Sequence, residues 1–350
     1  MQIVKKMITV IAALKSFGSI SVNISGMGWV KSACLLIWLF VAVPAYSTVT
    51  VTDLKCEYLT NPLGIDVSEP RLSWKSLDSN NTRGQQQTAF QVLVASSEAN
   101  LNADIGDLWD SGKTAGSDSV HIRYAGVPLD SGQNCYWKVR IWDKDDTATD
   151  WSPTARFSMG LLAAGDWNAS WIRLSSADIN DHIWYRKQFF IGDTVTKAFA
   201  YVGSFGYHEL YVNGQKVGDE VLVPSVMNLD TRVPYVTYDI TGLLQTGDNI
   251  VAIWSGPGWA LFNGFSAGDA KVIGQVDITT NSSAIQVVTD TTWKARVSSS
   301  KHLGRWKNSN FGGDEIDARL HIPGWNAVGF NDSGWSNPAV YSVAKRLPPR

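Results

Sequence analysis

The chain has 350 residues and a formal net charge of -2, from 30 lysines and arginines against 32 aspartates and glutamates. This length suffices for about two domains with full hydrophobic cores. The near-neutral charge excludes both the basic surplus of a nucleic-acid-binding protein and the acidic surplus of a solvating tail. Tryptophan is abundant at 16 residues, and we interpret most of these side chains as core anchors.

The N-terminus is predicted to be a secretory leader. Residues 33–44 form an apolar run that follows Lys31, and the small residues Ala45 and Ser47 come just after it. This order of cationic, apolar and small residues is typical of a signal peptide, and the run is short for a membrane span. The segment that begins at Met27 is the more typical signal, so we expect the start there. An uncleaved signal anchor is the alternative.

A secretory route predicts a secreted or extracytoplasmic protein with no membrane attachment after signal cleavage. It also makes the N-x-Ser/Thr glycosylation sequons relevant, which begin at Asn80, Asn168, Asn281 and Asn331. Two cysteines, Cys56 and Cys135, remain after the leader. They are too few for a metal site by themselves, and a bridge between them stays open because geometry decides it.

The mature chain shows short alternating segments between turn signals, which is typical of β-sandwiches. Strands of a first block are expected at residues 71–75, 89–96, 121–124, 135–143 and 155–159. In residues 135–143 the apolar face comprises Cys135, Trp137, Val139 and Ile141. Trp74 is the natural core tryptophan of the second strand. This block has the pattern of a fibronectin type III sandwich.

The second block is predicted to be a jelly-roll sandwich with two sheets of four or five strands. Its strands are expected at residues 184–192, within 198–222, and at 231–240, 248–256, 271–279 and 283–296. Asn213-Gly214 between alternating segments predicts a hairpin, because a type I′ turn needs positive φ at both positions. Residues 239–244 are expected to form a one-turn helix or a tight turn. The predicted division is a leader at 1–47 and sandwiches at 48–160 and 166–340.

Several phrases resemble one family, the bacterial-type α-L-rhamnosidases. Residues 54–74, 87–97, 108–113 and 136–145 resemble the fibronectin-like module at the start of these enzymes. Residues 206–225, 231–241 and 313–319 resemble the carbohydrate-binding-like sandwich that follows it. The resemblance implies an all-β fold, in which a fibronectin type III-like sandwich is followed by a jelly-roll β-sandwich.

In the family that this chain resembles, catalysis belongs to an (α/α)₆ barrel further along the chain, with carboxylates for an inverting hydrolysis of terminal α-L-rhamnosides. No position of this sequence matches those carboxylates. We therefore expect the non-catalytic N-terminal portion of a secreted α-L-rhamnosidase, without the barrel and without turnover of its own. The alternatives are a free-standing lectin-like module that binds rhamnose-containing glycans and an adhesion or scaffold protein.

The acidic residues and histidines give no convincing active site. Inverting hydrolysis needs two carboxyl groups about 6.5–9.5 Å apart. The candidates are Asp219, Glu220, Asp314, Glu315 and Asp317, which we expect to be solvated or turn-capping acids. The histidines, at positions 121, 182, 208, 302 and 321, lack metal-ligand spacing. His208 alternates within a strand and is expected to be exposed or in the core rather than catalytic.

A sugar site is the more credible prediction. Aromatic rings pack against sugar rings while polar side chains bind the hydroxyl groups. Asn228, Asp230, Trp259 and Asn263 could converge at one end of the second sandwich. The resemblance also allows a Ca²⁺ ion held by Asn228 and Asp230, since calcium takes oxygen ligands. Residues 224–232 and 256–265 both depart from the family pattern here. The alternative is that these residues only form turns in a supporting domain.

Overall fold

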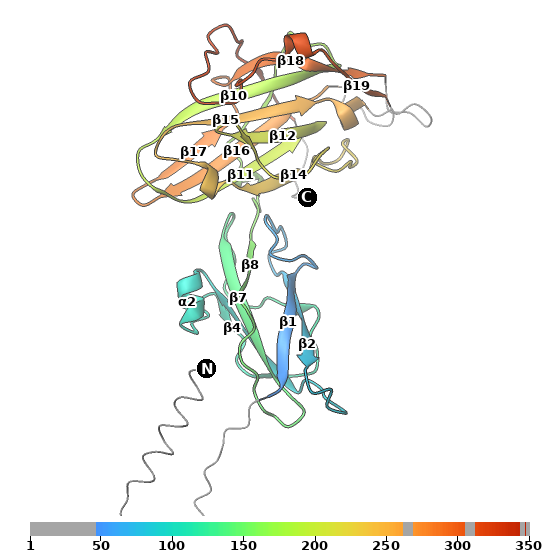
Figure 1. Ribbon diagram of the computed structural model, residues 1–350, viewed down its shortest axis with the longest axis vertical. Helices are drawn as coiled ribbons and strands as arrows, with labels where there is room; N and C mark the ends of the chain where they lie inside the picture. Colours follow the sequence, from blue (N-terminus) through green and yellow to red (C-terminus); the bar gives the residue numbers. More distant parts are fainter. Residues whose placement is uncertain (1–46, 262–268, 305–311, 344–346, 348–350) are drawn as a thin grey trace, which may run out of the picture. The chain divides into compact units, whose positions relative to one another are not determined.

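The structure is a computed structural model that describes residues 47–261, 269–304, 312–343 and 347. The described chain is nearly all β and forms two sandwiches, which confirms the predicted fold class (Figure 1). Residues 1–46 of the predicted leader, including Met27, lie outside the described residues. Within those residues, no helix is long and apolar enough to cross a membrane.

The first sandwich packs a three-stranded sheet against a five-stranded one. The smaller sheet contains, in order, β1 (Val49–Cys56), β2 (Arg71–Asp78) and β6 (Ile122–Arg123). The larger contains β4 (Trp109–Asp110), β3 (Ala89–Ala95), β7 (Asn134–Trp142) and β8 (Ala155–Ser158), with β5 (Thr114–Ala115) also paired to β3. A short helix, α2 (Glu98–Asn102), follows β3 and is capped by Ser97, whose Oγ accepts from the Asn100 N–H.

The core of this sandwich follows the predicted alternation. The apolar face of β7 is at most 1% exposed and comprises Cys135, Trp137, Val139 and Ile141. Trp74 is 2% exposed, and its Nε1–H donates to Gln87 Oε1 at 3.0 Å. Because a buried indole N–H needs a partner, Gln87 lets the ring sit in the core without an unsatisfied donor.

The two cysteines of the first sandwich are free thiols, so the open question of a bridge is answered in the negative. Cys56 and Cys135 belong to the same hydrophobic core. Burial raises the pKa of the Cys135 thiol to about 12 and that of Cys56 further, because a thiolate is poorly stabilised away from water. Both side chains therefore act as small apolar residues.

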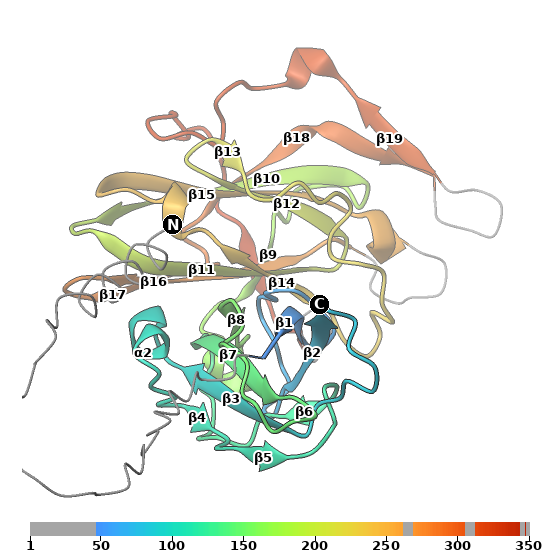
Figure 2. The ribbon, with the colours of Figure 1, turned by 60° about the horizontal axis from the view of Figure 1, so that its bottom comes forward.

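The second sandwich has two six-stranded sheets, which Figure 2 shows as two layers. One contains β13 (Gln215–Lys216), β12 (Tyr207–Val212), β15 (Gly247–Gly256), β10 (Asp181–Ile191), β18 (Lys294–Leu303) and β19 (Gly313–Ile316). The other contains β14 (Tyr235–Asp239), β11 (Val195–Ser204), β16 (Val272–Thr280), β9 (Trp171–Arg173) and β20 (Ala339–Tyr341), with β17 (Ala284–Val288) on β16. The prediction of four or five strands in each sheet was wrong. Short strands such as β13 contain too few residues to show an alternation of apolar and polar side chains. Single 3₁₀ turns occur at η1 (Ala164–Asp166), η2 (Thr241–Leu243), η3 (Gly258–Leu261) and η4 (Ala318–Leu320).

The predicted hairpin turn joins β12 to β13. Asn213 and Gly214 have φ angles of 50° and 85°, so the positive φ that a type I′ turn requires is present at both positions. The Asn213 side chain also accepts from the Ile250 N–H at 2.8 Å and donates to the Leu243 carbonyl at 2.9 Å. The turn is thereby tied to β15 and to η2, which confirms the prediction and explains why asparagine suits this position.

Residues 317–338, which we call the C-terminal segment, cover the outer face of the sheet that contains β10. The inner face of β10 contributes Ile183 and Tyr185 to the main core, whereas Trp184 points outward. The Trp184 ring is stacked with Trp325 at 5.1 Å and with Trp335 at 6.3 Å between centroids. This aromatic cluster gives the sheet a second, smaller core on its outer side.

Arg186 fixes the C-terminal segment over that face. Its side chain is 1% exposed and forms an ion pair with Asp332. Its guanidinium also donates to the Ala327 carbonyl at 3.0 Å and lies 5.2 Å from the centroid of the Phe330 ring. All three contacts are made to one segment, so the buried charge is satisfied only when that segment is in place.

Replacing Asp332 by alanine is expected to destabilise the protein by about 3 kcal/mol, because it leaves a buried guanidinium without its counter-charge. Asp332→Asn should cost less, since the amide oxygen still accepts a hydrogen bond. The free energy of unfolding from urea titration measures both effects.

The matched control is Asp145→Ala, which removes an exposed ion pair with Lys144. Exposed pairs contribute about 0–1 kcal/mol. Equal losses from Asp332→Ala and Asp145→Ala would contradict the anchoring role of Arg186.

Candidate functional site

Two of the predicted sugar-site residues share one exposed turn between β13 and β14. The Oδ1 atom of Asn228 accepts from the Asp230 N–H at 3.0 Å. The Asn228 carbonyl accepts from the N–H groups of Thr231 and Arg232 at 3.1 and 3.2 Å. These bonds form an Asx-type turn, which is a common reason for asparagine in a loop. Both side chains remain accessible to a ligand.

The third predicted residue, Trp259, lies in η3 and is anchored to the same loop. Its ring is half-buried, and its Nε1–H donates to the Pro224 carbonyl at 3.1 Å. It packs on a small core made of Trp171, Phe205, Leu229, Val233, Ala260 and Ile273. Because Leu229 lies between Asn228 and Asp230, these contacts link the indole to that turn. The fourth residue, Asn263, lies outside the described residues.

A calcium ion is poorly supported by the residues at this turn. Asn228 and Asp230 offer two side chains, and Asn228 Oδ1 already accepts a backbone hydrogen bond. Ca²⁺ takes about six to eight oxygen ligands. In the part of the chain that the structure describes, no group of three or more His, Cys, Asp or Glu side chains could hold a metal ion. The described residues therefore do not by themselves fit Ca²⁺.

A polar cluster that the sequence did not reveal is built from side chains of β10, β12, β18 and β19. Asp314 accepts from the Tyr207 hydroxyl at 2.8 Å, and its carboxylate lies 3.3 Å from His182 Nε2 and 3.5 Å from His302 Nδ1. Burial alone would raise the pKa of the Asp314 carboxyl, but the two histidines and the Tyr207 hydroxyl beside it hold that pKa well below its usual range.

The cluster corrects one expectation and supports another. Asp314 was expected to be a solvated or turn-capping acid, but its carboxylate lies on two buried histidines. Asp317 does cap a turn, because its side chain accepts from the Arg319 N–H at the start of η4. Sequence spacing could not find the cluster, since pairing of distant strands brings His182 and His302 together. The close network suits a structural role better than hydrolysis.

His208 lies in the core, which is one of the two positions predicted for it. Its side chain is fully buried, with Nδ1 2.9 Å from Ser204 Oγ and Nε2 3.1 Å from the Tyr238 hydroxyl. Burial lowers the pKa of His208 to about 3, because an imidazolium would lose its hydration. The ring is neutral in the folded protein and hydrogen-bonded on both nitrogens.

The depressed pKa of His208 predicts loss of stability in acid. Below about pH 6.5 the unfolded chain binds a proton at His208 and the folded chain does not. The free energy of unfolding should therefore fall between about pH 6.5 and pH 3, by at most roughly 1.4 kcal/mol per pH unit from this group. Urea titrations at several pH values measure this slope.

His208→Gln is expected to reduce that slope while lowering stability at neutral pH, because glutamine does not titrate. His321→Gln changes an exposed histidine and serves as the control. A slope that stays the same in His208→Gln would show that His208 does not contribute to the acid sensitivity.

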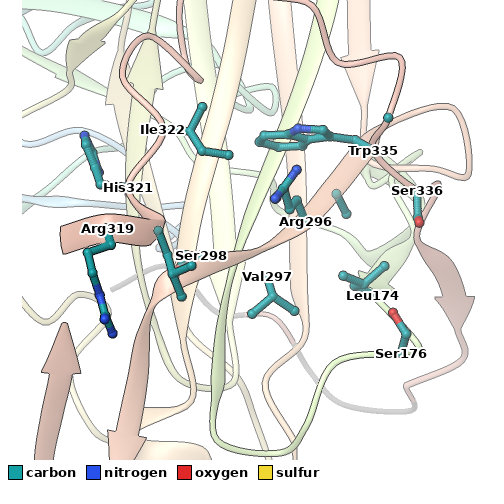
Figure 3. Close-up of a pocket in the computed structure, with 13 residues that line it drawn as sticks. Leu174, Ser176, Arg296, Val297, Ser298, Arg319, His321, Ile322, Trp335 and Ser336 are labelled. Carbon is teal, nitrogen blue, oxygen red and sulfur yellow. The ribbon is translucent and has the colours of Figure 1, made fainter. Parts of the chain in front are cut away.

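A pocket of about 520 Å³ lies between β18 and the C-terminal segment (Figure 3). Its lining includes Arg296 and Ser298 of β18, and His321, Trp335 and Ser336 of the segment. The volume lies within the range of small-molecule sites in proteins. Nothing in the sequence marks this pocket, because the C-terminal segment that forms one wall has no regular pattern.

Both sandwiches match domain families. Residues 51–163 match the "Rha78A-like, N-terminal immunoglobulin domain", and residues 193–348 match the "Alpha-L-rhamnosidase N-terminal domain". An α-L-rhamnosidase from Formosa agariphila is 32% identical over 309 residues, which are 83% of this chain and 33% of that protein. One from Alteromonas sp. is 31% identical over 304 residues, or 81% of this chain and 32% of that protein.

Solved structures agree with these matches. The α-L-rhamnosidase from Dictyoglumus thermophilum aligns with a TM-score of 0.78 at 32% identity, over 86% of this chain and 35% of that one. The enzyme from Aspergillus terreus aligns with a TM-score of 0.75 at 27% identity over the same shares. The chain thus spans about a third of the length of these relatives. It belongs to the α-L-rhamnosidase family, of which it contains the two N-terminal domains.

Proposed function

We propose that this chain is the non-catalytic, carbohydrate-binding N-terminal portion of a secreted α-L-rhamnosidase, and that its second sandwich contacts rhamnose-containing glycans. The observation that carries the proposal is the order of the two matched domains, both of which are N-terminal domains of that family. The free-standing lectin is not favoured, because the curated relatives are α-L-rhamnosidases.

The loop that holds Asn228 and Asp230 is the best candidate for the sugar contact in this proposal. The half-buried indole of Trp259 is fixed to this loop, so a sugar ring could pack on its exposed part while the neighbouring polar groups bind hydroxyls. Because the described residues do not fit a calcium ion alone, the proposed contact depends on these side chains and not on a metal.

Secretion is part of the same proposal. The predicted signal within residues 1–47 supports it. The side chains of all four predicted glycosylation sequons are exposed, at Asn80, Asn168, Asn281 and Asn331. Exposed sequons are compatible with passage through a glycosylating export route.

L-Rhamnose is expected to give measurable heat at millimolar concentration in calorimetric titrations, run both with added Ca²⁺ and with a chelator. In Trp259→Ala binding should weaken by about 1–3 kcal/mol. The fold should also lose stability, since the ring packs on a core, so titrations are run at a temperature where the variant is folded.

Two further variants make this test specific. Trp259→Phe keeps an aromatic platform but cannot donate to Pro224, and it should retain most of the binding. Trp142→Ala in the first sandwich changes a partly exposed tryptophan elsewhere and should not affect binding. Absence of heat in both conditions for the unaltered chain would refute the sugar-binding part of the proposal.

The purified 350-residue chain is expected to release no aglycone from a chromogenic α-L-rhamnoside, because no constellation of its described residues suits inverting hydrolysis. A commercial rhamnosidase in the same assay shows that the substrate is competent. Release that co-elutes with the chain on two chromatographic steps would overturn the non-catalytic assignment.

A further inference from the structure

A row of outward-facing side chains crosses four strands of the sheet that contains β10. Register pairs Glu209 with Trp254, Trp254 with Trp184, and Trp184 with Arg296. Directly paired residues of an antiparallel sheet lie on the same face. Arg296 therefore stands beside the tryptophan cluster at the edge of the area that the C-terminal segment covers, and it lines the pocket of Figure 3.

Arg296 differs from the other arginine of the pocket in its charge environment. Arg319 forms two hydrogen bonds with Asp317, at 2.8 and 2.7 Å, and its side chain is 89% exposed. In Figure 3 Arg319 extends away from Trp335. Arg296 has no hydrogen bond or ion pair to any residue that the structure describes. Its five N–H donors are thus available to a ligand.

The described lining of the pocket contains one arginine without an acidic partner, Arg296, and it also carries hydroxyl groups. It contains two arginines and a histidine and includes no aspartate or glutamate. Ser176 and Ser336 contribute hydroxyls at the side where Trp335 forms a wall. An arginine with no acidic neighbour in a hollow favours carboxylate or sulfate oxygens, which can accept two parallel hydrogen bonds from it.

We propose that this pocket binds an acidic sugar residue, whose carboxylate or sulfate group pairs with Arg296. The anionic group follows from the lining, and the sugar nature of the ligand rests on the proposed function. Rhamnose itself is uncharged, so this is a second subsite, separate from the loop at Trp259. A pocket of about 520 Å³ has room for one or two sugar rings.

The test is calorimetric titration of the full chain with four probes at low ionic strength: D-glucuronate, D-glucose 6-sulfate, D-glucose and inorganic sulfate. The two charged sugars are expected to bind at least about tenfold more tightly than glucose, because only they bring an anionic group to pair with Arg296. Arg296→Gln should remove at least that tenfold preference. The relative affinities of glucuronate and glucose 6-sulfate identify the acidic group.

Arg83→Gln is the matched control. It removes one charge from an exposed arginine of the first sandwich and should leave all four affinities unchanged. Arg319→Gln should have a smaller effect than Arg296→Gln, since Asp317 already neutralises Arg319. Thermal unfolding of each variant shows that the fold is retained.

Three results would overturn the proposal: equal affinity for glucuronate, glucose 6-sulfate and glucose, unchanged affinity in Arg296→Gln, or inorganic sulfate binding as tightly as the charged sugars. L-Rhamnose titrations of Arg296→Gln separate this subsite from the loop at Trp259. If the unaltered chain binds glucuronate but does not bind rhamnose, only the proposed rhamnose contact is contradicted.

Discussion

The buried guanidinium of Arg186 is the constraint on which the outer side of the second sandwich depends. A charge with 1% exposure must be paired and hydrogen-bonded, and here every such partner belongs to the C-terminal segment. Detachment of the segment would expose the ring of Trp184 and leave the Arg186 guanidinium without its ion pair. Aromatic packing and the Arg186 contacts together hold the segment on this face.

The position of that segment also determines which surfaces are open. Over β10 it packs closely, with Trp325 and Trp335 against Trp184. Over β18 it leaves the hollow that Arg296 lines. The loop at Asn228 and Trp259 depends on a different core, built around Trp171 and Phe205. The two candidate binding areas are therefore held by separate sets of contacts within one sandwich.

Local patterns in the sequence predicted local structure well. The alternation in residues 135–143 and the Asn213-Gly214 turn both appear as expected, because a strand face and a type I′ turn depend on adjacent residues. The family resemblance supplied the order of the domains. Trp259 is bonded to the loop that holds Asn228, and the role of both residues in binding stays a prediction.

Contacts between residues far apart in the chain could not be predicted from the sequence. Asp332 is 146 positions from Arg186, and nothing in either segment marks the other as its partner. The same holds for Asp314, whose carboxylate lies close to two histidines from separate strands. Polar residues in irregular segments look alike whether they are solvated or anchor a buried charge. Only the folded arrangement separates Asp314, whose carboxylate lies against two buried histidines, from Asp317, which caps a turn.

The two free thiols have a consequence for the folding of this chain under oxidising conditions. Once folded, Cys56 and Cys135 are buried and protonated, so oxidants and other thiols find no thiolate to attack. Before folding, both sulfurs have ordinary reactivity and can be captured in mixed or intermolecular disulfides. In an oxidising compartment the yield of native protein would then depend on two rates. The first sandwich must fold faster than its thiols are oxidised.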